Sequence, residues 1–348
     1  MTWDLIGHEW AVRLLQGHIR QNRVRQAYLF TGPAGIGRRT LALRFAQALQ
    51  CLNPPEPGVP CGVCAACRQI QRQQHPDLLV VQAPRQGGTL KVDQVRELQR
   101  QLALAPYQGP YRVALILRFE EAHPSAANAL LKTLEEPPPR VVLLLTAESP
   151  EALLPTIVSR CEVLRLRPLA PQALAEALEA RQHLPPEQAH RLAHLAHGRP
   201  GLALRWQQHP ETLAQREAYL HLLEELLHRD LLARFAWAEG WVKAQAHPAQ
   251  ALRPLLQAWL DFWRDVLLWR LGDPAAVTQV TRRDLIRWVA QNLTPAQVHR
   301  VVQRLLQGLE DLERHLNPRL LVEVILLETP EIPPPPPATT PASPGEGG

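Results

Sequence analysis

Short apolar runs alternate with amphipathic helical stretches along the first half of the chain. Runs of this length and composition are typical of strands buried in a parallel sheet. Five segments are therefore interpreted as strands: 27–30, 75–81, 113–117, 141–146 and 162–166. The helical patterns before and between them cover 3–25, 40–49, 92–104 and 126–136. This alternation predicts a doubly wound α/β domain over residues 1–167.

Strand patterns stop after residue 167, and only helical patterns follow. Short helices at 171–180, 186–196 and 200–207 predict a small helical lid domain over 168–208. Longer helical patterns predict an all-helical C-terminal domain over 209–329. Its expected helices are 211–228, 229–244, 252–271, 281–291, 295–316 and 318–327.

Two features of composition add to this picture of the helical half. Seven of the nine tryptophans lie between Trp206 and Trp288, where we expect them to pack between helices rather than to stack on nucleic-acid bases. Residues 330–348 hold eight prolines together with Gly, Thr and Ser, so we expect a disordered tail there.

The overall composition is that of an ordinary water-soluble protein. Of the 348 residues, 46% are hydrophobic and 20% are charged. The chain has no run of about 20 apolar residues, so we expect no membrane span. The N-terminus lacks an apolar signal core, so we expect a cytoplasmic protein with no membrane partner. A net charge of +5 and a pI near 9.2 permit a nucleic-acid or acidic partner without establishing one.

A glycine-rich segment, TGPAGIGRRT at 31–40, separates the first strand from the helix that follows it. Gly32, Gly35 and Gly37 have the spacing of a phosphate-binding loop, in which glycines let backbone N–H groups point at phosphate oxygens. The helix N-terminus adds a partial positive charge. Strand, loop and helix in this order predict a P-loop-type nucleotide site, and the alternative is a plain strand-to-helix turn.

The chemical groups that complete such a loop are altered in this chain. A working P-loop carries a Lys that reaches the β- and γ-phosphates, followed by a Ser or Thr that holds Mg²⁺. Here Arg38 and Arg39 occupy those positions, and Thr40 comes one residue late. An Arg can still meet a phosphate, but Arg39 cannot ligate a metal. The loop therefore predicts a degenerate site, and whether it binds ATP stays open.

The ends of two other strands bear on the same site. Thr146 ends the 141–146 strand, at the edge where ligands bind in open parallel sheets. The acids that an ATPase needs at the end of the 113–117 strand are missing there. Glu120 and Glu121 come a few residues later, and we interpret them either as substitutes or as surface acids.

Four of the five cysteines lie within 17 residues, at Cys51, Cys61, Cys64 and Cys67. In a cytoplasmic protein this density favours a metal over disulfides. Four thiolates can surround Zn²⁺ tetrahedrally and close its shell, which makes a structural site rather than a catalytic one. The alternative is a set of unrelated buried cysteines.

Motifs spread over nearly the whole chain resemble one family. They are LIGHE at 5–9, AYLFTGPAGIG at 27–37, the four-cysteine insert, HPD at 75–77, ANALLKTLEEPP at 127–138, PTIVSRC at 155–161 and NPRLLVE at 317–323. The chain resembles the delta-prime subunits of the bacterial DNA polymerase III clamp loader, which are AAA+ proteins akin to the gamma/tau motor subunits. The resemblance implies an AAA+ fold with an inserted zinc module, a lid, and a C-terminal collar domain for oligomerisation.

The resemblance also implies partners and a site. It implies a pentameric ring with gamma/tau and delta subunits, which loads a sliding clamp at primer–template DNA, and in which delta-prime is a stator. Arg160 of the SRC motif would be an arginine finger that reaches the γ-phosphate of ATP bound by the neighbouring subunit. The alternative is a structural Arg paired with a nearby acid. Lys132 and Glu135 are interpreted as ring-interface or helix-supporting residues.

Further departures from the motor subunits agree with a stator. Leu117 and Arg118 stand where the acidic pair belongs, and Leu202 stands where motor subunits carry an Arg that touches the nucleotide. Two alternatives remain open. One is a gamma/tau-like ATPase in which Arg38, Thr40 and Glu120 act as unconventional substitutes. The other is a free-standing zinc-dependent DNA-binding protein, whose affinity would depend on salt as phosphate contacts require.

Overall fold

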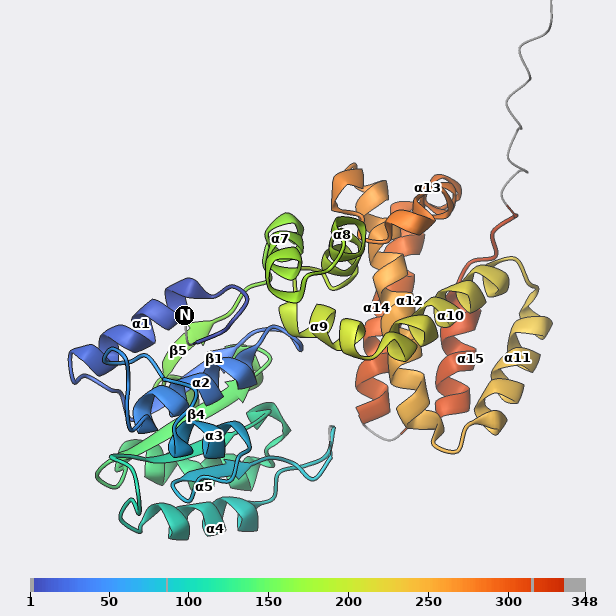
Figure 1. The fold of residues 1–348 in the computed structure, drawn as a ribbon. Helices are drawn as coiled ribbons and strands as arrows, with labels where there is room; N and C mark the ends of the chain where they lie inside the picture. The colour runs from blue at the N-terminus through green and yellow to red at the C-terminus, as the bar shows by residue number, and fades with distance from the viewer. Residues whose placement is uncertain (1–2, 86, 314–315, 335–348) are drawn as a thin grey trace, which may run out of the picture. The chain divides into compact units, whose positions relative to one another are not determined.

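The structure is a computed structural model that describes residues 3–85, 87–313 and 316–334. The chain divides into two compact units, Met1–Arg205 and Trp206–Gly348. Figure 1 shows the sheet in the first unit and helices alone in the second. The predicted lid, 168–208, falls almost entirely within the first unit. Within the described part of the chain, no helix combines the length and apolarity needed to cross a membrane.

The first unit is built on a five-stranded parallel sheet, which confirms the predicted α/β class. Its strands are β1 (Ala27–Thr31), β2 (Leu78–Val81), β3 (Arg112–Ile116), β4 (Val141–Ala147) and β5 (Glu162–Arg165), in the order β2-β3-β4-β1-β5. All five predicted strands are present. The carboxyl ends of β1, β3 and β4 lie side by side, so the loops after them meet at one edge.

Helices cover both faces of this sheet (Figure 1). They are α1 (Glu9–Arg20), α2 (Arg38–Gln50), α3 (Ala65–Gln71), α4 (Val92–Leu102), α5 (Pro124–Glu135) and α6 (Pro155–Val158). Alternate side chains of β1 serve the two faces: Tyr28 and Phe30 pack with α1 and α2, whereas Ala27 and Leu29 pack with α4 and α5. This arrangement explains why the strands are apolar on both sides.

The opening helix is shorter than the predicted 3–25. Asp4 and His8 have φ values of 40° and 64°, so the chain turns before α1 begins at Glu9. Asn22 has φ 54° just after α1 ends. These left-handed residues interrupt a stretch whose apolar spacing alone resembled one continuous helix.

The lid follows β5 as α7 (Pro171–Gln182), α8 (Pro186–Leu195) and α9 (Pro200–Gln208). Gly198 has φ 69°, and a Cβ there would lie 1.9 Å from the carbonyl oxygen of Leu169. The amide of Leu169 donates to the Gly198 carbonyl at 2.9 Å. Only glycine fits this close approach, which ties α9 to the segment after β5.

The HPD motif starts a buried turn rather than a strand, so β2 begins three residues later than the predicted 75–81. The Asp77 side chain is fully buried, and its carboxylate accepts from the backbone N–H groups of Tyr107, Gln108 and Gly109 at 2.6, 2.8 and 2.9 Å. Burial alone would raise the pKa of this carboxyl, but the three N–H groups outweigh it and hold the pKa below its ordinary value.

Asp77 therefore makes a pH-dependent contribution to stability. Its folded pKa is depressed, so the contribution is complete above the unfolded pKa of about 4 and is lost as pH falls through the folded pKa. We expect Asp77→Asn to lower the free energy of unfolding by about 2 kcal/mol at pH 7 and by less in acid. Denaturant unfolding from pH 7 to pH 3 measures the gap, that is, the difference in unfolding free energy between the wild type and Asp77→Asn. Asp93→Asn is the control, because the Asp93 carboxyl is exposed on α4. A gap that does not change with pH would contradict this role.

The second unit is all helical, as predicted. Its helices are α10 (Pro210–Leu227), α11 (Leu231–Ala244), α12 (Pro248–Arg270), α13 (Arg283–Asn292), α14 (Pro295–Glu313) and α15 (Pro318–Glu328). Helix α12 begins four residues earlier than predicted and contacts α10, α13, α14 and α15. Trp259 and Trp263 on α12 are buried in this core, which confirms that these tryptophans serve packing.

The predicted disordered tail is wrong for its first residues. Ile332 is 1% exposed, and its amide donates to the carbonyl of Leu227 at 3.0 Å. Trp288 Nε1 donates to the Pro333 carbonyl at 3.0 Å. One apolar residue among the prolines thus anchors the segment on the helical unit. Residues 335–348 lie outside the described part of the chain.

Candidate functional site

The glycine loop lies at the carboxyl edge of the sheet, between β1 and α2. Gly32, Gly35 and Gly37 have φ values of 143°, 81° and 110°, which L side chains rarely adopt. A Cβ on Gly32 would lie 2.5 Å from the Leu166 carbonyl oxygen, and the Gly32 amide donates to the Glu148 carbonyl at 3.0 Å. The loop therefore has backbone geometry that depends on its glycines.

The lid packs directly on this loop. The amide of Gly201, at the start of α9, donates to the Gly35 carbonyl at 2.8 Å. A Cβ on Gly35 would lie 3.1 Å from Cβ of Leu202. Leu202 thus lies against the loop with an apolar side chain, which has no charge to offer a phosphate.

Arg38 is the first residue of α2, where a P-loop has its lysine. Its Nη1 atom is buried without a hydrogen-bond partner in the described part of the chain. Burial lowers the pKa of Arg38, and the nearby carboxylates of Glu120 and Glu148 oppose that shift. Glu120 therefore lies near the loop despite its late position in the sequence. Burial raises the pKa of Glu120, and Arg38 opposes that shift in turn.

A left-handed residue brings Glu120 back to the loop. Arg118 has φ 51°, so the chain folds into a short 3-10 turn, Phe119–Glu121, directly after β3. The Arg118 amide donates to Thr146 Oγ1 at 2.9 Å, and its side chain pairs with Glu121 at 2.9 Å. Thr146 and Glu121 thus both bind Arg118, the first through its amide and the second through its side chain. Thr40, by contrast, is exposed in the first turn of α2.

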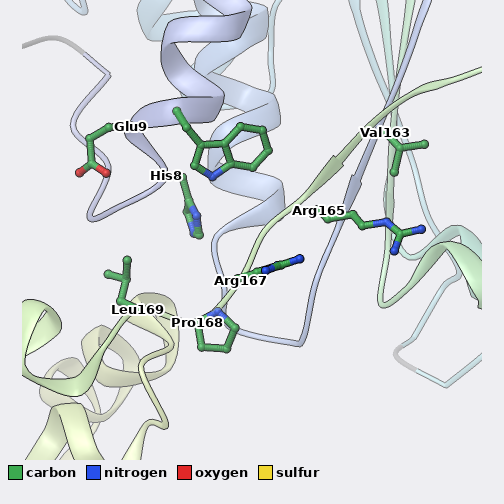
Figure 2. Close-up of a pocket in the computed structure, with 8 residues that line it drawn as sticks. His8, Glu9, Val163, Arg165, Arg167, Pro168 and Leu169 are labelled. Atoms are coloured by element: carbon green, nitrogen blue, oxygen red, sulfur yellow. The ribbon is translucent and has the colours of Figure 1, made fainter.

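His8 was not predicted as a site residue, although it lies in the LIGHE motif. It is 4% exposed, and its Nε2 donates to the carbonyl of Ile36 in the glycine loop at 2.9 Å. A cavity of about 620 Å³ opens beside it, lined by residues that include Glu9, Arg165 and Arg167 (Figure 2). Spacing alone could not reveal it because its walls come from α1 and from the segment around β5.

Arg160 lies in the short turn between the end of α6 at Val158 and the start of β5 at Glu162. Its Nη2 atom lies 2.6 Å from Glu135 Oε1, and its Nη1 donates to the Thr156 carbonyl at 2.9 Å. The side chain is 35% exposed. The guanidinium is therefore accessible at the surface, as a finger requires, and is also paired with an acid, as a structural Arg would be.

The structure brings the four cysteines of the insert together. The sulfurs of Cys51, Cys61, Cys64 and Cys67 all lie within 4.8 Å of one another. Zinc bound tetrahedrally at about 2.3 Å separates its sulfurs by about 3.8 Å, so the residues fit this ion. Backbone amides of Cys61, Cys64 and Cys67 point at sulfurs of the group at 3.3–3.4 Å, which stabilises thiolates.

Buried polar contacts join the four-cysteine insert to the α/β domain. Gln47 on α2 is 1% exposed, and its Nε2 donates to the Cys67 carbonyl at 2.7 Å. Trp3 Nε1 donates to the Gly58 carbonyl at 3.0 Å. These contacts fix the cysteine insert to α2 and to the segment before α1.

Removing one ligand tests that role. We expect purified protein to hold one Zn²⁺ per chain and Cys64→Ser to lose it, with a loss of stability on the order of 3 kcal/mol. Metal analysis and thermal unfolding measure both effects. Cys161→Ser changes the one cysteine outside the group and should keep the metal. Metal retained by Cys64→Ser would overturn the assignment.

Comparisons with known proteins identify the family. A family model described as DNA polymerase III, delta subunit, matches residues 7–170, and one described as DNA polymerase III subunits gamma and tau domain III matches 213–338. The chain is 30% identical to the DNA polymerase III subunit delta′ of Bacillus subtilis, over 91% of this chain and 94% of that protein. It is 33% identical to the delta′ subunit of Pseudomonas aeruginosa, over 89% of this chain and 93% of that protein.

A solved gamma-subunit-related protein of Thermotoga maritima aligns over 92% of this chain and 97% of that one, with a TM-score of 0.43 and 18% identity. The chain therefore belongs to the delta-prime subunits of the DNA polymerase III clamp loader.

Proposed function

We propose that this chain is the stator of a pentameric clamp-loader ring and donates Arg160 to the ATP site of a neighbouring gamma/tau subunit. The ring would also contain a delta subunit and would place a sliding clamp on primer–template DNA. The chain's own glycine loop would not hydrolyse ATP. Zinc would hold the cysteine insert in shape and take no part in the chemistry.

The accessible, anchored guanidinium of Arg160 is the observation that carries this proposal. An arginine that enters a neighbour's site stabilises the charge that develops on the transferred phosphoryl group. To do so, it has to stand at the surface of its own subunit, away from its own phosphate loop. Arg160 is 35% exposed, and the contacts that hold it come from α5 and α6 rather than from the glycine loop.

The condition of the chain's own loop supports the second half of the proposal. Arg38 replaces the compact lysine ammonium with a planar fork, and Arg39 replaces the magnesium-binding hydroxyl. Leu202 lies against the loop where a cationic side chain would meet a phosphate. Three parts of an ATPase are altered together, whereas the glycine geometry is kept.

Reconstitution of clamp loading tests the role in the ring. We expect gamma/tau and delta subunits to load a sliding clamp onto primed DNA only when this chain is added. Loading is measured as clamp retained on circular DNA with ATP present. Equal loading without the chain would sink the stator role.

One observation favours a second candidate, a gamma/tau-like ATPase. Arg38 and Glu120 each oppose the shift that burial causes in the other's pKa, so an acid from the turn after β3 approaches the loop. In this reading Arg38 would bind phosphate, and Thr40 and Glu120 would serve magnesium and water. It predicts ATP turnover by the isolated chain, which the stator role excludes.

A further inference from the structure

The acid paired with Arg160 lies on a separate helix. Glu135 is the last residue of α5, and its Oε1 lies 2.6 Å from Nη2 of Arg160. A second edge of the guanidinium is held by α6 and the turn after it, since Nη1 donates to the Thr156 carbonyl at 2.9 Å and to Ser159 Oγ at 3.4 Å. The guanidinium is thus fixed from two directions by groups of different elements.

The two helices that carry these groups share one apolar core. Leu130 and Leu134 on α5 and Ile157 on α6 are buried in the same cluster, and α5 contacts α6 directly. The backbones beneath Glu135 and Arg160 are therefore held in a fixed relation by packing. A salt bridge built on such a base loses less side-chain freedom than one between two mobile surface residues.

Holding the guanidinium in advance favours its action on a phosphate. A free arginine side chain samples many rotamers and has to lose that freedom when it meets its ligand. A carboxylate on one edge and a carbonyl on another restrict those rotamers before the ligand arrives, while the remaining N–H groups stay available. The 35% exposure of the Arg160 side chain leaves it open to a neighbouring subunit.

We propose that Glu135 is a positioning residue that orients Arg160 for the ATP site of the neighbouring subunit. This inference rests on the finger role of Arg160 under the proposed function. Glu135 itself touches no nucleotide. It gives a specific role to the acidic end of the ANALLKTLEE helix, which the sequence alone assigned only to the ring interface or to helix support.

Steady-state ATP hydrolysis by the reconstituted ring tests the proposal. We expect Glu135→Ala to lower kcat on the order of 10-fold with KM nearly unchanged, because orientation of the finger is lost and ATP binding in the neighbour is kept. Glu135→Asp should recover part of the rate, since a carboxylate remains. Glu136→Ala, the adjacent exposed glutamate, is the matched control and should hydrolyse at the wild-type rate.

A double substitution separates positioning from general damage. If Glu135 acts through Arg160, then Arg160→Ala with Glu135→Ala should be no slower than Arg160→Ala alone. Thermal unfolding of Glu135→Ala should match that of Glu136→Ala, so a fall in kcat is not loss of fold.

The outcomes distinguish the inference from the function on which it rests. A wild-type rate in Glu135→Ala, with a slow Arg160→Ala ring, would overturn the positioning role and leave the finger intact. A faster Glu135→Ala ring would also overturn it, because the pair would then hold Arg160 back. A wild-type rate in Arg160→Ala would remove the finger role and this inference together.

Discussion

Replacing Arg160 with alanine should lower hydrolysis at the adjacent ATP site of a reconstituted ring by about 10³-fold. The reason is electrostatic, since in the proposed role the guanidinium would compensate charge that develops on the transferred phosphoryl group only in the transition state. We therefore expect the loss in kcat rather than in KM. Single-turnover experiments measure the hydrolysis rate at the affected site. The steady-state rate of the ring should also fall if its ATP sites act in concert.

A surface arginine with a similar ion pair is the control for this variant. Arg229 pairs with Glu225 at 3.2 Å and has a half-exposed side chain. Arg229→Ala should leave ring turnover unchanged. Equal rates for Arg160→Ala and Arg229→Ala would make Arg160 a structural residue, which was the other interpretation of the SRC motif.

Replacing Arg234 with methionine should lower the stability of the helical unit by about 3–5 kcal/mol. Arg234 on α11 is 3% exposed, and its guanidinium makes five hydrogen bonds to backbone carbonyls. The acceptors belong to the C-terminal ends of α10 and α15 and to the residues that follow: Leu226, Leu227, Leu326, Thr329 and Pro330. Carbonyls at a helix end lack partners within the helix and carry partial negative charge. Removing the guanidinium leaves them without a donor, which lowers the stability of the helical unit strongly.

Tryptophan fluorescence during denaturant unfolding measures this effect selectively. Seven of the nine tryptophans lie between Trp206 and Trp288, inside the second unit. Methionine keeps an apolar stem of similar length, so the expected loss comes mainly from the unpaired carbonyls. Arg229→Met, on the exposed surface, should change stability by less than about 0.5 kcal/mol. Similar midpoints for the two variants would show that the carbonyls find other partners.

Local patterns predicted the elements of the fold well because each depends on near neighbours in sequence. The buried strands and amphipathic helices follow from period and composition, and the strand order brings their loops together. Contacts between distant segments could not be predicted in this way. Asp77 meets amides some 30 residues away, and Arg234 meets carbonyls more than 90 residues away. Nothing near either residue in the sequence signals those partners.

The candidate site also has parts that local sequence patterns predict and parts that depend on contacts between distant segments. The glycine loop and the four cysteines have spacings that carry their chemistry, so they were identified without coordinates. The resemblance also implied Leu202 at the nucleotide loop, and the fold places it there. His8 at the loop and Glu135 beside Arg160 come from other parts of the chain, and their contacts required the fold. The tail illustrates a different limit, since its proline content hid the single anchoring residue Ile332.

In the proposed function this chain acts on a neighbour's ATP and has no ATPase of its own. Hydrolysis of ATP with Mg²⁺ by the isolated, full-length chain tests it most directly. We predict no turnover above the background without protein, and none that depends on Arg38 or Glu120. Sustained turnover by the isolated chain that is abolished by Arg38→Ala would contradict the stator role and identify a working motor.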